Sequence, residues 1–338
     1  MKKHRILAII MALAAAVLYA VNIPLSKMLL QSVEPVFMSA FLYLGAGAGI
    51  GILYLLTKKQ SKEKKDRLTK AELPYTIGMI VLDIAAPIFL MIGLTSATAA
   101  NASLLNNFEI VSTAIVALLV FKELISKRLW VAILFITLAS MLLSLEGISG
   151  FRFSVGSLFV LAACVCWGFE NNCTRKMSSK NTFEIVTLKG IFSGVGSFLI
   201  AMLLGEKLPT MSFIICIMLL GFVSFGLSIF CYIRAQNELG AAKTSAFYAV
   251  APFIGSLLSY IIFQETLGWI YFTALLLMLI GAAMVVWDTF VMEHTHLHTH
   301  TIVHTHDGST HTHIVEHTHL HTHSDSEKVH THQHEDLS

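Results

Sequence analysis

The feature that most constrains the fold of this chain is a long apolar stretch that occurs twice. Residues 99–123 align without a gap with residues 241–265, and both copies open on Ala-Ala-x-x-Ser and close on Phe-x-Glu. A second repeat is shifted by 148 positions. The residues Tyr19, Asn22 and Lys27 have the same spacing as Trp167, Glu170 and Arg175, so an aromatic residue, an amide or acid, and a basic residue recur in the same order. Because an internal repeat dictates architecture, the sequence predicts two related halves.

The composition predicts that most of the chain lies in lipid. Of its 338 residues, 55% are hydrophobic and 13% charged, against about 25% charged in soluble domains. A membrane-spanning helix needs about 20 apolar residues, and it must satisfy its own backbone polar groups. We therefore predict an all-α integral membrane protein with ten transmembrane helices: residues 5–26, 34–56, 74–94, 97–120, 129–147, 153–172, 183–204, 211–231, 240–263 and 268–290.

The distribution of Lys and Arg predicts the orientation of these helices. With a cytoplasmic N-terminus, 18 basic residues fall on the inner side and 3 on the outer side, in agreement with the positive-inside rule. Both termini are then cytoplasmic, and the chain is a multi-pass protein of the cell membrane. Five helices in each half mean that the second half enters the membrane upside down. We predict two five-helix repeats of inverted topology, residues 1–150 and 151–292, followed by a tail, residues 293–338.

Small residues and prolines inside the predicted spans indicate how the helices pack. The pairs Gly47/Gly51 and Gly190/Gly194 have the Gly-x-x-x-Gly spacing that lets helices approach closely. Pro24, Pro87 and Pro252 lie within or at the ends of spans, where each can open backbone hydrogen bonds and give a kink or a hinge. We therefore expect close helix crossings at these glycines and kinks or hinges near the three prolines.

Over residues 5–290 the chain resembles the drug/metabolite transporter superfamily, in its EamA branch. The resemblance rests on the ten predicted spans, the inverted halves, the aromatic-x-x-Asn-x-x-x-x-basic motif that closes the first helix, and the Ala-Ala-x-x-Ser…Phe-x-Glu stretch. It implies secondary transport, without ATP, that exports small metabolites such as amino acids or amines. The second copy has Glu170 where the first has Asn22, so the substrate does not carry over from relatives.

Polar side chains inside the predicted spans are the candidate substrate-binding residues. An ionisable group at the centre of the bilayer costs about 2.5–3.5 kcal/mol on insertion scales, so each one is a functional suspect. The candidates are Asp83, Asn106, Asn107, Glu109, Glu170, Asn171, Asn172 and Lys189.

Four of these candidates also have a structural alternative. Glu170 and Lys189 lie near the same end of adjacent predicted helices, where they can neutralise one another. Asp83 and Glu109 have no obvious partner, so we expect at least one of them to bind substrate or a proton. Asn106 and Asn107 lie about 100° apart around a helix, so at most one is expected to face a cavity. Hydrogen bonding between helices is the alternative for either amide.

Two glutamates, Glu123 and Glu265, close the repeated stretch, and we interpret both as ends of helices in water. The membrane region shows neither a nucleophile–base pair nor a set of metal ligands. We therefore predict that the protein is not an enzyme.

The tail has a different composition and repeats Glu-His-Thr-His-Leu-His-Thr-His identically at residues 293–300 and 316–323. Its low apolar content predicts disorder. Imidazoles at alternate positions suit Zn, Ni, Co and Cu, which predicts several labile metal sites and no required cofactor. A pH-responsive tail and a purification tag are the alternatives. The proposed ligands are His294, His296, His298, His300, His304, His306, His311, His313, His317, His319, His321, His323, His330, His332 and His334.

Three functions are compatible with these features. The leading hypothesis is a secondary exporter of a small organic metabolite, with residues 5–147 rocking against 153–290 around a midplane cavity and protons as a possible coupling ion. The first alternative is a divalent-metal transporter whose tail collects the ion, with Asp83, Glu109 and Glu170 as ligands. The second is a membrane sensor or scaffold that transports nothing. The predicted partners are the lipid bilayer and a small solute, not nucleic acid, and the sequence does not indicate an oligomeric state.

Overall fold

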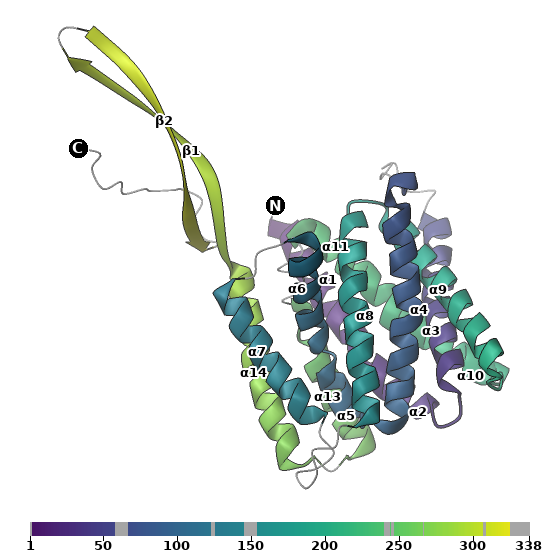
Figure 1. Cartoon of the computed structure of the whole chain (residues 1–338). Helices are drawn as coiled ribbons and strands as arrows, with labels where there is room; N and C mark the ends of the chain where they lie inside the picture. The colour runs from purple at the N-terminus through teal and green to yellow at the C-terminus, as the bar shows by residue number, and fades with distance from the viewer. Residues whose placement is uncertain are drawn as a thin grey trace. The chain divides into compact units, whose positions relative to one another are not determined.

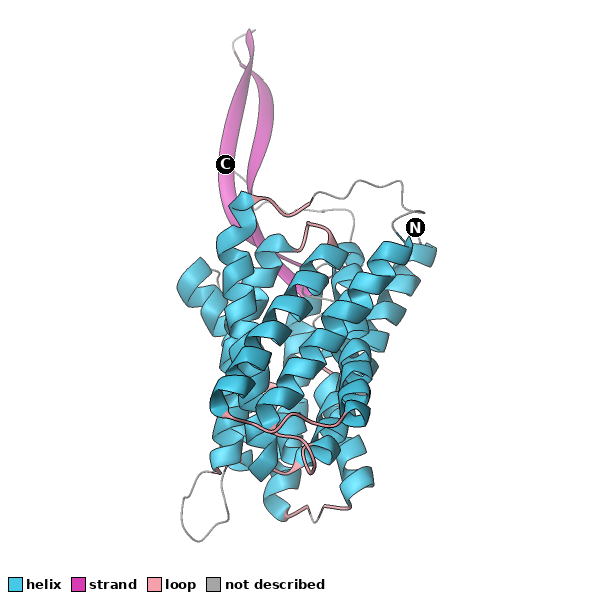
Figure 2. Cartoon of the chain, turned by 90° about the vertical axis from the view of Figure 1, so that its right-hand side faces the viewer, coloured by secondary structure: helices cyan, strands magenta, loops and turns pink. Residues whose placement is uncertain are grey.

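The fold is described by a computed structural model that covers residues 2–57, 67–122, 126–144, 154–239, 244, 247–265, 267–306 and 309–324. It divides into two compact units, residues 1–285 and 286–338 (Figure 1). The first unit is a bundle of helices that run roughly parallel or antiparallel to one another (Figure 2). The last helix, α14, crosses the boundary between the units.

The helices follow the predicted halves along the chain. The first half contains α1 (Lys2–Ala20), α2 (Asn22–Leu29), α3 (Pro35–Thr57), the 3-10 turn η1 (Lys70–Glu72), α4 (Leu73–Ser96), α5 (Ala99–Leu105), α6 (Phe108–Phe121) and α7 (Lys127–Leu143). The second contains α8 (Val155–Met177), α9 (Thr182–Leu204), α10 (Met211–Gly221), the π-helix η2 (Phe222–Leu227), α11 (Ser228–Leu239), α13 (Ala251–Phe263) and α14 (Trp269–Phe290).

Seven helices in the described part of the chain are long and apolar enough to cross a membrane. Three predicted spans, residues 129–147, 153–172 and 240–263, fall on α7, α8 and α13, which are not among the seven. α7 and α13 have only 17 and 13 residues, and α8 carries acidic, amide and basic side chains in its second half. The count of ten spans therefore remains a prediction.

Local sequence explains where several helices begin and end. Thr98, Ser126 and Ser154 accept backbone N–H bonds at the starts of α5, α7 and α8, as N-cap residues do. Lys122 and Gln264 end α6 and α13 in the left-handed conformation, with φ of 55° and 49°. These two residues occupy the same position in the two copies of Phe-x-Glu, so the repeated sequence forms the same helix end twice.

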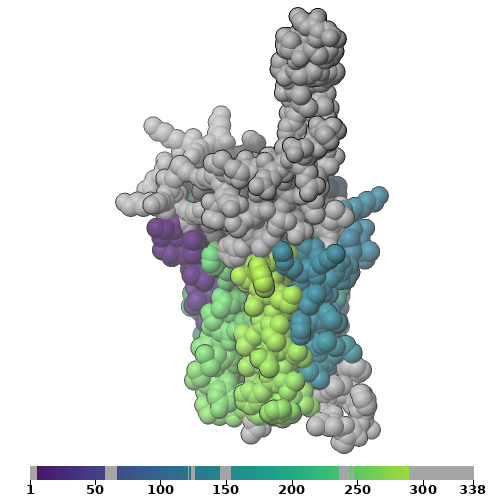
Figure 3. All heavy atoms as spheres, turned by 90° about the vertical axis from the view of Figure 1, so that its left-hand side faces the viewer, coloured from purple at the N-terminus to yellow at the C-terminus, as the bar shows by residue number. Residues whose placement is uncertain are grey.

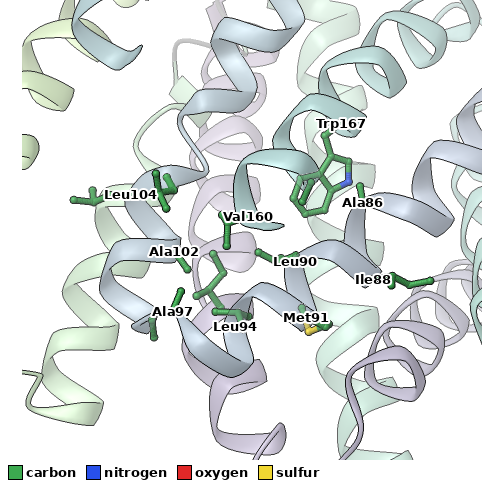
Figure 4. Packing of buried hydrophobic residues seen from close by; sticks show 14 of the residues in the cluster. Ala86, Ile88, Leu90, Met91, Leu94, Ala97, Ala102, Leu104, Val160 and Trp167 are labelled. Carbon is green, nitrogen blue, oxygen red and sulfur yellow. The ribbon is translucent and has the colours of Figure 1, made fainter. Parts of the chain in front are cut away.

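Glycines bring helices of the two halves into backbone contact, as predicted for Gly47 and Gly190. A Cβ added to Gly190 would lie 2.3 Å from the backbone nitrogen of Gly47, at the crossing of α3 and α9. A Cβ on Gly156 would lie 2.7 Å from the carbonyl oxygen of Gly93, where α4 crosses α8. Around the α4–α8 crossing the core is apolar, and Figure 4 shows Leu94 and Val160 within it.

The outer surface of the bundle is also apolar. Figure 3 shows one face of it, where α14 lies between α13 and α7. Leu134, Leu257 and Leu276, one from each of these helices, are more than half exposed. A soluble monomer rarely exposes such a continuous apolar surface, so this face is suited to lipid.

Glu265 does more than end a helix in water, which corrects the interpretation from the sequence. It is half-buried and accepts hydrogen bonds from the backbone N–H groups of Ala99 and Ala100, at 2.9 and 3.1 Å. A carboxylate is favoured there because the first N–H groups of α5 have no helical partner. The contact joins the second half to the first, and Glu123, its counterpart in the repeat, lies outside the described residues.

The second unit contains an antiparallel hairpin, which differs from the disordered tail that we predicted. β1 (Val291–His306) pairs with β2 (Ser309–Ser324), with Val291 opposite Ser324 and His306 opposite Ser309. The frequent Thr, Val and Ile residues, spaced with a period of two, have strand propensity, which our argument from low apolar content neglected. His330, His332 and His334 lie outside the described residues.

Candidate functional site

Three spans of the bundle are broken in their middle. One break lies at Val21 between α1 and α2, and another lies at Asn106 and Asn107 between α5 and α6. The third precedes α13, which begins at Ala251 with Pro252 in its first turn, where the sequence predicted a kink. At Val21, Asn106 and Asn107 the backbone keeps right-handed helical angles and local hydrogen bonds, so these two breaks are tight turns within a helical path. Interrupted helices build the binding sites of many secondary transporters.

A small pocket lies where these breaks meet. Its lining comes from all three broken spans: Tyr19, Ala20, Ile23, Ser103, Asn106, Ala251, Pro252 and Gly255. The cavity measures about 10 Å³, which is room for about one water molecule.

Amide side chains at the breaks are buried, and several of their groups have no partner. Asn106 donates from Nδ2 to the hydroxyl of Tyr19 at 3.3 Å, and its Oδ1 lies 3.8 Å from the Cys164 thiol, which donates to it. Within the described residues, Asn107 makes no side-chain hydrogen bond, and Nδ2 of Asn22 is also unpaired. Unsatisfied buried amides are rare and call for a functional or solvent explanation.

A charge cluster lies between α4, α8 and α9, and consists of Asp83, Glu170 and Lys189. The ammonium of Lys189 lies 3.0 Å from Asp83 Oδ2 and 3.0 Å from Glu170 Oε1. All three residues are buried, with at most 6% of their surface exposed. The contact with Asp83 is a charge contact rather than an aligned hydrogen bond, since Oδ2 accepts none in the described part of the chain.

Two hydroxyls complete the charge cluster. Tyr43 of α3 donates to Asp83 Oδ1 at 2.9 Å, and Thr174 donates to Glu170 Oε1. When all three groups are ionised, the two carboxylates and one ammonium have a net charge of −1. An uncompensated buried charge is costly, so the cluster is suited to take up one proton or one further cation.

A further carboxyl, which is half-buried, lies between α6 and α8. Glu109 accepts a hydrogen bond from Nδ2 of Asn171 at 2.6 Å, and the same Nδ2 lies 3.3 Å from the hydroxyl of Thr113. The neighbouring Asn172 donates to the carbonyl oxygens of Thr113 and Gly168, at 3.1 and 2.9 Å. Asn172 therefore has the bonding expected of an amide that holds two helices together.

The structure corrects two expectations from the sequence. Glu170 and Lys189 pair, but Asp83, which we expected to lack a partner, contacts the same ammonium. Glu109 likewise has a partner in Asn171. The reason is geometric: sequence spacing does not give the rotation of each helix about its axis, and that rotation decides which side chains of different helices meet.

Two residues of the site were not among the candidates. Nothing in the sequence around Tyr43 distinguishes it from an ordinary aromatic residue of an apolar span. Tyr19 was part of the repeated aromatic-x-x-Asn motif, and that motif could have placed it beside the break at Val21. In the described part of the chain, no group of three or more His, Cys, Asp or Glu residues is arranged to hold a metal ion.

The fold and the site define a multi-pass membrane protein with a buried polar centre. The EamA-like transporter family matches residues 6–145 and 154–287, so the chain belongs to this family, whose members are transporters rather than enzymes.

Two relatives agree with this assignment, and a solved structure has a similar fold. An uncharacterized transporter of Methanothermobacter thermautotrophicus is 24% identical over 84% of this chain and 88% of its own length. An uncharacterized transporter of Clostridium kluyveri is 26% identical over 76% of this chain and 86% of its own length. A protein crystal structure with 19% identity has a TM-score of 0.61, covering 83% of this chain and 96% of that one, and shows the fold alone.

Proposed function

We propose that the protein is a secondary transporter that exports a small organic metabolite, such as an amino acid or an amine, by alternating access. The observation that carries this proposal is the buried charge cluster, whose net charge of −1 favours binding of a cation or a proton. The Lys/Arg asymmetry supports a cell-membrane location with both termini cytoplasmic.

The pocket at the helix breaks supports an organic solute. α13 begins there, and the N-terminal end of a helix favours an anionic group such as a carboxylate. The unpaired amides of Asn22 and Asn107 lie at two of the breaks and offer donors and acceptors to a polar solute. A solute with both an ammonium and a carboxylate group matches these features.

Protons are the proposed coupling ion, with Asp83 or Glu109 as the group that carries them. Both carboxyls are held by hydrogen-bond donors that tolerate either protonation state, a tyrosine hydroxyl and an asparagine amide. Transport that stays flat between roughly pH 5.5 and 8.5 would remove this hypothesis, because an essential titrating group leaves its mark on the pH profile.

A thermal-shift screen on detergent-purified protein tests the function. The panel holds amino acids, amines, nucleosides and salts of Zn, Ni, Co and Mn, applied to the full chain and to a chain ending at Met292. A ligand at a hundredfold excess over its Kd stabilises the folded state by about 2.7 kcal/mol. We expect stabilisation of both chains by an organic solute and its loss in Asp83→Asn or Glu109→Gln. Stabilisation of the shorter chain by metal alone would instead support a metal transporter.

For the tail we propose an accessory role in binding Zn, Ni, Co or Cu. The register of the hairpin supports this role, because all twelve histidines of β1 and β2 fall on one set of alternating positions. Alternating positions of paired strands share one face of the ribbon. In four of the cross-strand pairs both residues are histidine: His294 and His321, His296 and His319, His298 and His317, and His304 and His311.

The same tail favours the alternative of a divalent-metal transporter. Against this alternative stands Lys189, whose ammonium lies 3.0 Å from an oxygen of each carboxylate of the charge cluster and so keeps the two carboxylates from jointly chelating one metal ion. The shorter chain in the screen separates the two functions, since it retains the charge cluster and lacks the tail.

A further inference from the structure

Aromatic rings connect the charge cluster to the pocket. Tyr43, whose hydroxyl donates to Asp83, has its ring centroid 5.1 Å from that of Phe225. Phe225 in turn contacts the ring of Tyr19 edge-on, at 5.8 Å and 88°. Tyr19 lines the pocket, and its hydroxyl accepts the hydrogen bond from Asn106. Phe225 is thus the single ring between the tyrosine that binds Asp83 and the tyrosine that binds Asn106.

Phe225 is carried by the π-helix η2, and it is 2% exposed. A π-helix holds one more residue than an α-helical turn, and such segments occur frequently at functional sites. Its return to α geometry shifts the following residues by one position, or about 100° around the axis. Such a change would give the segment two discrete arrangements, which energetic coupling between sites requires.

Contacts around η2 fix the present arrangement. Just after it, Ser228 donates to the carbonyl oxygen of Ala15 in α1, at 2.8 Å. Within it, a Cβ on Gly226 would lie 3.2 Å from the backbone of Ala46 in α3. The π-helix thus packs between the helix that contributes Tyr19 and the helix that contributes Tyr43.

We propose that Phe225 is a positioning residue that couples the charge at Asp83 to the conformation of the pocket. Removing charge at Asp83 weakens the charge-assisted hydrogen bond from Tyr43, the ring of Phe225 follows, and Tyr19 then changes its hold on Asn106 at the break between α5 and α6. Facing Asp83 from the neighbouring helices are Tyr43, Glu170 and Lys189. The inference rests on the proposed function, since it takes the cluster and the pocket as parts of one transport cycle.

Cys164 offers a readout that requires no knowledge of the substrate. Its buried thiol lies 3.5 Å from the carbonyl oxygen of Leu105 and near Asn106, so its reactivity reports opening of this break. The experiment uses the full chain with the other four cysteines changed to serine: Cys166, Cys173, Cys216 and Cys231. The measured quantity is the rate of alkylation by N-ethylmaleimide, with and without Asp83→Asn.

We expect Asp83→Asn to change this rate by about tenfold, which corresponds to about 1.4 kcal/mol in the opening equilibrium. In a chain that carries Phe225→Leu, the same change at Asp83 should alter the rate by less than about twofold, equivalent to about 0.4 kcal/mol. Phe225→Tyr keeps the ring and should retain the response. Phe222→Leu is the matched control, because Phe222 belongs to η2 but packs against Gly49, and it should also retain the response.

Tyr43→Phe is a second variant that keeps the ring and removes the hydrogen bond to Asp83, so it should uncouple as Phe225→Leu does. It decides the matter if Phe225→Leu does not fold. A full response in Phe225→Leu or in Tyr43→Phe, or an equal loss in Phe222→Leu, overturns the inference. No response to Asp83→Asn in the parent chain also overturns it. The proposed function fails separately, if no organic solute stabilises the protein in the thermal-shift screen.

Discussion

The charge cluster and the pocket divide the polar centre of this protein in two. The cluster lies on α4, α8 and α9, which are continuous helices, and its charged groups all have partners. The pocket lies where three spans are broken, and its lining is uncharged. The separation teaches that the ion pairs of the cluster are held by uninterrupted helices, whereas the breaks carry mainly uncharged polar groups, with Glu109 in the first turn of α6 as the exception.

The largest effect on stability is expected from replacing Lys189, the cation of the charge cluster. Lys189→Met leaves two buried carboxylates side by side, and removing one partner of a buried ion pair costs about 3–5 kcal/mol. Thermal unfolding in detergent measures the loss. Adding Asp83→Asn to Lys189→Met should restore most of the stability, since one carboxylate then remains. A stable single variant would show that the cluster is not charged as we describe.

Two amides sharpen the comparison between a paired and an unpaired group. Asn172→Ala removes two hydrogen bonds, to the carbonyls of Thr113 and Gly168, and should destabilise the fold by about 1–3 kcal/mol, at about 0.5–1.5 kcal/mol for each bond. Asn107→Ala removes an amide without hydrogen bonds, so stability should stay the same or rise while transport falls. Equal loss of stability in both variants would mean that Asn107 is structural.

The pH dependence of transport separates the two regions further. Asp83→Asn should change the shape of the pH profile, because it removes the proposed proton carrier. Asn106→Ala should weaken apparent affinity about fivefold, the value of one lost hydrogen bond of about 1 kcal/mol, and leave the profile unchanged. Initial rates in proteoliposomes at several pH values measure both, and a profile shifted by Asn106→Ala would contradict the division.

The smallest effect is expected from the tail. Ending the chain at Met292 should change the unfolding free energy of the bundle by less than about 0.5 kcal/mol, as for changes remote from the core. Calorimetric titration with Ni²⁺ should show several sites in the full chain and none in the shorter one. Tight Ni²⁺ binding by the shorter chain would place metal in the membrane region instead.

The sequence predicted the helical class, the repeat and the buried charges, because these depend on composition and spacing. It identified Asp83, Glu109 and Lys189 by the cost of placing ionisable groups in lipid. It did not predict that Asp83 meets Lys189, 106 positions later, since helix rotation and crossing decide that contact. The break at Asn106 was missed too, because two adjacent amides in an apolar run read as an ordinary helix.

For the tail, the prediction failed because it used the composition of the segment and not the order of its residues. Its composition predicted disorder, yet the two identical motifs pair antiparallel in the structure, with Glu293 opposite Thr322. The share of apolar residues in a segment says nothing of their order along the chain, and alternation of threonine with histidine is a property of order alone.

The crossing of Gly47 and Gly190 has a mechanical consequence for any rocking of the two halves. Because no side chain separates the two backbones, the helices can rotate about this crossing. They resist sliding along one another, because a shift of one residue would push the side chain of Ala46 or Ile191 into the gap. Residues close to the crossing move least in such a rotation. Lys189, next to Gly190 in the chain, therefore stays close to the carboxylates throughout a pivot while the helix ends swing. A change of charge can then form or break the ion pairs, because the movement of the helix ends does not by itself separate the charged groups.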